Sequence, residues 1–477
     1  MPDILSVGID IGTSTTQLVF SRITMENTSG YFSVPHVAIT RKEVIYKSRV
    51  HLTPLLSPVR IDGPAVRRLV AQEYRQAGYT PADVDTGAVI ITGESARKEN
   101  AAAVLENLSD FAGEFVVSTA GPDLESVIAG KGSGACEYSR QTGRPVANLD
   151  IGGGTTNIAI FQDGQAVSRG CLDIGGRLIR LAPDWTVTQI SPAARLVAQD
   201  LGLPLEPGAR TGPGELSRLT DRMAGLLAQA LWLAPAEPLL EKLYTPGSSR
   251  LEKPARPLAR LCFSGGVADC MEQTGQDPLR YGDIGILLGQ SLRQGLLGSA
   301  LPRLRPEETI RATVVGAGSY TTSVSGSTIT YSEAALFPLK NLPVLRLTPE
   351  EQALCLEGRG EELEEKIRWF LAQQDADQLI LSLPGLPDPE YAPLQRLARA
   401  LAGAAHRALP PGRPALVVLE QDMAKALGLL MKKELNGARP VVCLDGVRAE
   451  QGDYVDLGRP VLEGLAIPVV VKTLLFG

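Results

Sequence analysis

The sequence predicts a mixed α/β protein with two related lobes followed by a third α/β region at the C-terminal end. Three observations support this prediction. One hairpin pattern occurs twice, apolar strand patterns alternate with helical patterns, and the composition shifts beyond about residue 340. The chain has 477 residues, of which 44% are hydrophobic and 21% charged. This composition is that of a folded globular protein and excludes global disorder.

Charge and the rarer residue types narrow the classes of function. The 47 Lys and Arg against 53 Asp and Glu give a net charge of −6, which argues against nucleic acid as the main partner. The six cysteines form no Cys-x-x-Cys pair and the three histidines lie far apart, so we expect no disulfide framework and no His-based metal site. The longest apolar run, residues 223–236, is too short to span a bilayer, and residues 1–7 lack the basic region of a signal peptide. We therefore expect a cytoplasmic protein without a membrane segment.

The repeated hairpin is the strongest local signal. An apolar strand, a turn rich in Gly and Thr and a second apolar strand occur at 10–20 and return 140 residues later, at 150–160. Five of the eleven positions are identical, which predicts two β-hairpins in two related lobes. The expected domains are a first lobe at 1–140, a second lobe at 141–335 and a C-terminal α/β region at 336–477.

The other elements continue the alternation. Between the hairpins we expect helices and strands, in chain order a helix at 62–77, a strand at 88–91, a helix at 96–111, a strand at 114–118 and a helix from about 122. After the second hairpin we expect strands at 166–174, 261–263 and 312–315, helices at 192–201 and 215–233, and a loop or linker at 243–260. The last region reads as βαβαβ, with strands at 379–383, 415–419, 440–444 and 467–475 and helices at 390–409 and 422–435. The acidic run 360–366 is expected to be the first turn of a helix, with an acidic docking patch as the alternative.

The two hairpin tips have the composition of a phosphate-binding turn. Phosphate binding needs backbone N–H groups and hydroxyls without bulky side chains, so it selects Gly, Ser and Thr at a tight turn. The candidate residues are Gly12, Thr13, Ser14 and Thr15 in the first tip and Gly152, Gly153, Gly154 and Thr155 in the second. Asp10 and Asp150 precede these tips at the strand ends, and two such carboxylates suit Mg²⁺. Asp-x-Gly is also ordinary turn chemistry, but two matching copies favour a nucleotide clamp.

A third glycine turn follows the strand predicted at 261–263. Ser264, Gly265 and Gly266 come directly after this strand and before a helix start. Such a turn lets the backbone approach a flat adenine and its ribose, so we expect these residues to bind the nucleoside.

The ordered set of motifs resembles that of the actin, sugar kinase and heat-shock-chaperone ATPase superfamily, whose two ribonuclease-H-like lobes clamp ATP. In this resemblance 10–16 and 150–156 are the phosphate motifs, 261–268 is the adenosine motif, and 125–130 and 314–318 are the connecting helices. The resemblance implies that Asp10 and Asp150 hold Mg²⁺ through water. It also implies that Asp150 or Glu125 orients the attacking water, and that Gly316 lies at the nucleotide.

Over its whole length the chain resembles a narrower family, the reactivating ATPases of ethanolamine ammonia-lyase, on segments 7–17, 148–157 and 467–474. This resemblance implies a chaperone-like protein that uses ATP and Mg²⁺ to release damaged cobalamin from the lyase, so that adenosylcobalamin can enter. It also implies an ethanolamine-utilisation setting, often a bacterial microcompartment. Without the resemblance, the residues themselves support only an ATP-binding fold with two lobes. A small-molecule kinase and a scaffold or filament ATPase stay open as alternatives, as does a homo-oligomer.

Overall fold

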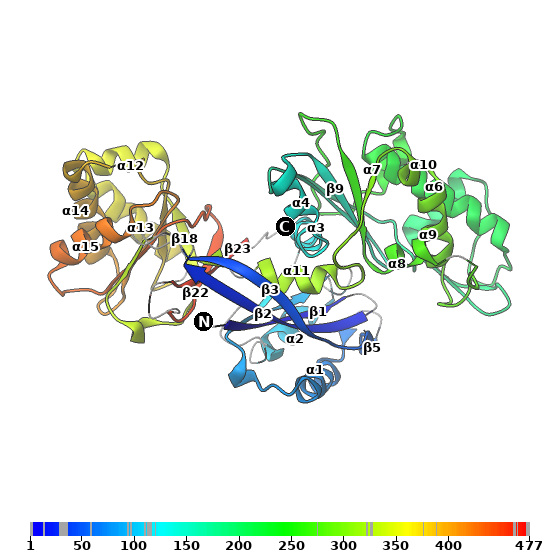
Figure 1. Ribbon diagram of the computed structural model, residues 1–477, viewed down its shortest axis with the longest axis horizontal. Coiled ribbons are helices and arrows are strands. Elements are labelled where there is room, and N and C mark those ends of the chain that lie inside the picture. The colour runs from blue at the N-terminus through cyan, green and yellow to red at the C-terminus, as the bar shows by residue number, and fades with distance from the viewer. Residues whose placement is uncertain are drawn as a thin grey trace.

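The structure, a computed structural model, describes residues 3–12, 15–27, 37–57, 60–92, 95, 98–108, 111, 117–119, 121–273, 275–320, 323–324, 328–374, 376–387, 389–460, 464 and 466–473. Within these ranges three large β-sheets define three bodies, and Figure 1 shows the third body beside the first two. None of the helices in these ranges combines the length and the apolar character that crossing a membrane requires.

The first sheet has the strand order β3-β2-β1-β7-β8. β1, β2 and β3 are antiparallel, whereas β7 and β8 continue the sheet in parallel. The bounds are β1 Asp3–Ile11, β2 Thr15–Asn27, β3 Val37–Lys47, β7 Thr86–Ile91 and β8 Val117–Thr119, with the short strand β4 His51–Leu52 paired to β2. Val7 and Ile9 of β1 pack into a core with helix α1 (Gly63–Ala77) and helix α2 (Ala101–Leu108). α2 is shorter than the helix expected at 96–111.

The second sheet repeats the first. Its order is β11-β10-β9-β14-β15, again with three antiparallel strands followed by two parallel ones. The bounds are β9 Val146–Ile151, β10 Thr156–Gln162, β11 Gln165–Leu172, β14 Arg260–Ser264 and β15 Arg303–Leu304. The duplicated hairpin is therefore the first two strands of each sheet, and the predicted pair of ribonuclease-H-like lobes is confirmed.

The helices expected in the second lobe are also present. Two of them, α5 (Pro192–Asp200) and α6 (Pro213–Ala230), begin with a proline at the first helical position, where its missing N–H costs no hydrogen bond. The remaining elements are β12 Ile179–Leu181, β13 Val187–Ile190, α7 Pro238–Lys242, α8 Gly266–Glu272, α9 Gly285–Gln294 and α10 Leu296–Ser299.

Two helices cross between the lobes. Helix α3 (Pro122–Gly132) contacts β9, β10 and β11 of the second sheet, and helix α11 (Ala312–Tyr320) contacts β1, β2 and β7 of the first. The crossing is a backbone contact, because a Cβ on Gly316 would overlap the carbonyl oxygen of Ile128. The expectation of a strand at 312–315 is wrong. A short apolar run does not separate a strand from a buried helix, and this run is buried because α11 lies between α3 and the first sheet.

The third sheet has eight strands in the order β16-β23-β22-β18-β19-β20-β21-β17. β18 to β21 are parallel, and the predicted βαβαβ arrangement is confirmed by β19, α14, β20, α15 and β21. The acidic run 360–366 opens helix α13, as expected. The strands are β16 Ser323–Val324, β17 Ile329–Tyr331, β18 Leu339–Arg346, β19 Ile380–Leu383, β20 Ala415–Leu419, β21 Val441–Leu444, β22 Asp453–Leu457 and β23 Pro468–Thr473. The helices are α12 Pro349–Leu356, α13 Gly360–Gln374, α14 Tyr391–Ala408 and α15 Ala424–Leu435.

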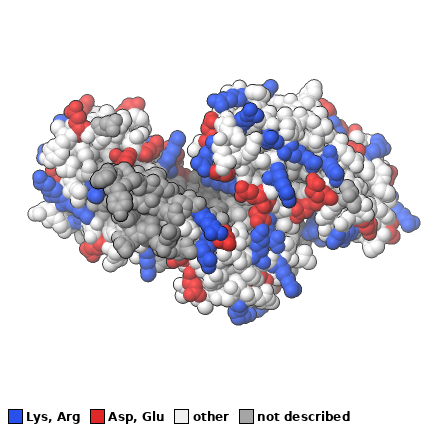
Figure 2. All heavy atoms as spheres, viewed as in Figure 1, with Lys and Arg blue, Asp and Glu red and all other residues white. Residues whose placement is uncertain are grey.

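The third body meets the first where β16 contacts β3, near the place where the long β2–β3 hairpin points toward the third sheet in Figure 1. The domain boundaries expected at 140/141 and 335/336 stay a prediction. On the face shown in Figure 2, basic and acidic side chains are interspersed over all three bodies.

Candidate functional site

A cavity of about 470 Å³ is lined by residues of both lobes. It brings together most of the residues that the sequence predicted for a nucleotide site: Asp10, Gly12, Thr15, Glu125, Asp150, Gly152, Gly153, Gly154, Thr155, Gly265 and Gly266. These residues come from four separate segments of the chain, and the sheet order explains their meeting, because β1 and β9 are the central strands of equivalent sheets.

Two of the described residues that the sequence predicted, Ser264 and Gly316, do not line this cavity. Ser264 is buried behind Asp150, and its Oγ donates to Asp150 Oδ1 at 2.6 Å. Gly316 lies in the crossing of α3 and α11, where it allows the close approach of the two helices. Thr13 and Ser14 lie outside the described residues.

The turns that follow the two aspartates have the same closure. Gly12 N donates to Thr15 O at 2.8 Å, and Gly152 N donates to Thr155 O at 2.9 Å. The second turn is also held from outside, since Arg177 N donates to Gly153 O at 2.7 Å. Each hairpin is thus closed at the base of its tip by a backbone hydrogen bond, an arrangement that suits close approach of a phosphate.

Asp10 is a buried carboxylate, 9% exposed, at the end of β1. It shares a face of the strand with Gly8, which packs against Val314 of α11, because alternate residues of a strand point to the same side. Thr92 Oγ1 donates to Asp10 Oδ1 at 2.9 Å. Burial and, to a smaller extent, the charge of Asp150 raise the pKa of Asp10 to about 7, although the hydrogen bond from Thr92 lowers it.

Asp150 is the equivalent carboxylate of the second lobe and is 5% exposed. It accepts hydrogen bonds from Ser264 and, at 3.4 Å, from Thr313 Oγ1 of α11. Burial raises the pKa of Asp150 to about 6, although both hydroxyl groups lower it. Two buried carboxylates that repel one another favour a cation in the cavity.

Glu125 lies on the first turn of α3 and is buried in the cavity wall. Its helix is anchored by the neighbouring Asp123, which accepts a hydrogen bond from Ser249 N at 2.9 Å and pairs with Arg169 at 3.4 Å. The anchoring ties the loop expected at 243–260 to α3 and fixes which side chains of this helix reach the cavity.

The turn that the sequence predicted to bind a nucleoside lies in the cavity wall, at the start of α8. Gly265 has a φ of +85°, and a Cβ here would overlap the backbone of Ile151, so the turn requires glycine. Tyr281, 45% exposed, also lines the cavity. So does an ion pair of Arg177 Nε with Asp283 Oδ2 at 3.1 Å.

The sequence did not predict several lining residues. Among them are Thr92, Thr313, Arg177, Tyr281, Asp283, Gln17 and Asn157. The first five belong to no sequence motif, so no local pattern indicates that they line a site. Gln17 and Asn157 did carry a signal, since each stands at the same place in the duplicated hairpin.

The donor set fits Mg²⁺. Two carboxylates, Asp10 and Asp150, and two amide oxygens without partners, on Gln17 and Asn157, line the cavity. Mg²⁺ prefers oxygen ligands and keeps several of its waters, so one or two carboxylates are enough to bind it. Among the described residues no three His, Cys, Asp or Glu side chains gather closely enough to hold a metal ion by themselves.

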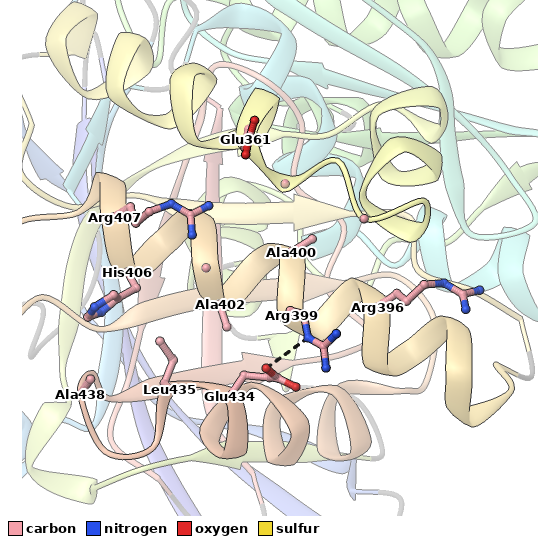
Figure 3. A pocket seen from close by; sticks show the side chains of 13 residues that line it. Glu361, Arg396, Arg399, Ala400, Ala402, His406, Arg407, Glu434, Leu435 and Ala438 are labelled. Atoms are coloured by element: carbon pink, nitrogen blue, oxygen red, sulfur yellow. Dashed lines mark hydrogen bonds and ion pairs between the residues drawn. The ribbon is translucent and has the colours of Figure 1, made fainter.

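A second cavity, of about 520 Å³, lies in the third body between α13, α14 and α15. Figure 3 shows three arginines of α14 along it. Arg399 pairs with Glu434 at 3.4 Å, Arg407 pairs with Glu364 at 2.5 Å, and Arg396 donates to the carbonyl oxygen of Leu356. Because this body already supplies partners for these guanidinium groups, the cavity between the lobes is the better candidate for a nucleotide.

Comparison with known proteins gives consistent matches. The chain matches the family model described as ethanolamine utilisation protein EutA over residues 2–477. Two relatives, each named ethanolamine ammonia-lyase reactivase EutA, are 37% identical, one from Salmonella typhimurium (strain LT2) over 483 residues and one from Escherichia coli (strain K12) over 487 residues. Each alignment covers 99% of this chain and 98% of the relative. Among solved structures, ethanolamine utilization protein EutJ from Carboxydothermus hydrogenoformans is 16% identical, with a TM-score of 0.32 over 67% of this chain and 90% of that chain.

Proposed function

The chain belongs to the family of ethanolamine utilisation protein EutA, and we propose that it is a chaperone-like, Mg²⁺-dependent ATPase that reactivates ethanolamine ammonia-lyase. It binds the inactivated lyase, promotes the release of damaged cobalamin and allows intact adenosylcobalamin to enter. We place this activity in the cytoplasm, in association with an ethanolamine-utilisation microcompartment.

One observation carries the ATPase part of the proposal. Two copies of the same turn, each preceded by a buried aspartate, line one cavity from two lobes. A triphosphate with its cation is a ligand that such a pair of turns can hold from both sides.

The residues that line the cavity have different roles in this ATPase. When bound, Mg²⁺ neutralises charge on the phosphates, which is a large part of what phosphoryl transfer requires. Asp10 and Asp150 hold its water shell from the two lobes, while the N–H groups of the glycine turns donate to phosphate oxygens. Glu125 or Asp150 orients the attacking water, since both carboxylates line the cavity.

Coupling to the lyase follows from the position of the cavity. A ligand that contacts both lobes favours one separation of the lobes, and hydrolysis removes part of that contact. The two nucleotide states then differ in affinity for the lyase, and each tenfold difference corresponds to about 1.4 kcal/mol.

The test is recovery of lyase activity after inactivation with hydroxocobalamin. Addition of this protein, adenosylcobalamin, Mg²⁺ and ATP should restore activity, whereas a non-hydrolysable ATP analogue should not sustain it. A pull-down should retain different amounts of lyase with ATP and with ADP.

Equal recovery with and without the protein would contradict the proposal, as would equal retention of lyase in both nucleotide states. ATP-dependent phosphorylation of a small alcohol would instead support a kinase. Nucleotide-dependent polymers in a sedimentation assay would support a scaffold ATPase.

A further inference from the structure

The wall of the cavity between the lobes carries two buried amide side chains that the proposed function leaves unused. Gln17 and Asn157 both line the cavity and are only 3% and 2% exposed. Gln17 Oε1 and Asn157 Oδ1 have no hydrogen-bond partner. A buried carbonyl oxygen without a donor costs free energy, and a native protein that keeps one usually has a use for it.

The two amides occupy equivalent positions. Gln17 is the register partner of Asp10 in the β1–β2 pair, and Asn157 is the register partner of Asp150 in the β9–β10 pair. Residues directly opposite one another in antiparallel strands share a face, with Cβ atoms about 5 Å apart. Each lobe therefore places an unpartnered amide oxygen beside a buried carboxylate.

These oxygen atoms cannot satisfy one another, because an amide oxygen and a carboxylate are both acceptors. The orientation of Gln17 follows from chemistry, since its Nε2 donates to the carbonyl oxygen of Ile310 at 3.2 Å and only the NH₂ group can do so. A ligand that satisfies these amide oxygens has to supply hydrogen-bond donors to both lobes.

We propose that Gln17 and Asn157 are positioning residues for the divalent cation. Their carbonyl oxygens accept hydrogen bonds from the waters that surround the Mg²⁺ held by Asp10 and Asp150, an inference that rests on the proposed function. Mg²⁺ keeps several waters, and each water has two donors for such acceptors. Neutral amides add these acceptors without adding negative charge to a cavity wall that already contains five carboxylates, those of Asp10, Glu125, Asp150, Asp269 and Asp283.

The experiment measures ADP binding by isothermal titration calorimetry at a series of free Mg²⁺ concentrations. Asn157→Leu keeps the shape of the side chain and removes the acceptor, so the Mg²⁺ concentration at half-maximal ADP binding should rise about tenfold, as for other groups around metal ligands. Asn157→Asp keeps an acceptor and should stay within about threefold of the wild type or need less Mg²⁺. Gln165→Leu, on the exposed first residue of β11, is the matched control and should match the wild type.

Thermal unfolding without nucleotide or Mg²⁺ separates this role from a structural one. Asn157→Leu removes a buried oxygen that has no donor, so the ligand-free variant should be as stable as the wild type or more stable. A variant that is less stable without ligands and binds Mg²⁺ normally would show a structural role only.

The second amide gives an independent measurement. Gln17→Met should also raise the required Mg²⁺ concentration, while its ligand-free stability falls because Ile310 loses a donor. Wild-type Mg²⁺ dependence in both Asn157→Leu and Gln17→Met overturns the inference. If the wild-type protein binds no ADP at any Mg²⁺ concentration, the proposed function itself fails, which is a different and recognisable result.

Discussion

Single residues determine what the cavity between the lobes can hold. Burial gives Asp10 and Asp150 pKa values of about 7 and about 6, because removal from water disfavours a charged carboxylate. A cation in the cavity reverses this preference, so metal binding and ionisation of the two carboxylates are coupled. Thr92 and Thr313 orient these groups from the first lobe and from α11, respectively.

Replacement of either aspartate should remove most ATP turnover. We expect Asp10→Ala or Asp150→Ala to lower the turnover number at least about tenfold, because placement of the cation and charge stabilisation dominate phosphoryl transfer. Release of inorganic phosphate measures this rate. Glu206→Ala removes an exposed carboxylate of the second lobe and should keep the wild-type rate. Full turnover in both aspartate variants would refute their assignment.

Asp445 in the third body predicts a pH dependence of stability. Its carboxylate is buried after β21, where it accepts a hydrogen bond from Thr328 N at 3.2 Å, and burial raises its pKa to about 6. Because this pKa is above the unfolded value, the folded state binds the proton more tightly. The resulting stability is complete below about pH 4 and is lost as the pH rises through about 6.

Differential scanning calorimetry at pH 5 and pH 7.5 can measure this effect. The wild-type transition of the third body should move to lower temperature at pH 7.5 by about 2–4 °C more than that of Asp445→Asn, which corresponds to about 1 kcal/mol. Equal shifts in the two proteins would show that another group carries the pH dependence.

At the scale of elements, the crossing of α3 and α11 is a close contact of two helix backbones. Gly132 and Gly316 face the backbone of the opposite helix, and a Cβ on either would overlap a carbonyl oxygen. We expect Gly316→Ala to destabilise the first two bodies by about 1–3 kcal/mol, the usual range for overpacking.

A helical glycine with open space provides the comparison for this variant. Gly225 lies inside α6 and a Cβ there meets no atom within 4 Å. Gly225→Ala should therefore stabilise the protein by about 0.5–1 kcal/mol, since alanine favours helix. Unfolding in urea measures the free energy of unfolding of both variants. An unchanged value for Gly316→Ala would mean that α3 and α11 can move apart without cost.

The elements also show what the sequence could predict. The hairpins were predictable because their turns need Gly and Thr in both copies. The central strands of the third sheet were predictable because each is a short apolar run between helical patterns. The helix at 312–315 was not predictable from the pattern, because a short apolar run does not separate a strand from a buried helix. Helix α11 was expected only from the resemblance, at 314–318. Its true neighbours, Gly8 and Ile128, are distant in the sequence.

At the scale of the whole molecule, the order of motifs predicted the two lobes, and most of the candidate residues it gave meet in one cavity. The candidate carboxylates and glycine turns lie where the duplicated pattern placed them, because a repeated sheet brings equivalent strand ends to one cleft. The orienting hydroxyls of Thr92 and Thr313, and the position of Gly316 away from the cavity, depend on packing between segments. A single sequence carries no local pattern for such contacts.

The crossing of α3 and α11 between the lobes has a consequence for biosynthesis. One side of the first sheet, with Val19 and Ala88, is covered by Val314, Val315 and Ala317 of α11. On the ribosome, the part of this side that α11 covers stays exposed until residues 312–320 have also been translated, which is after the strands of the second sheet.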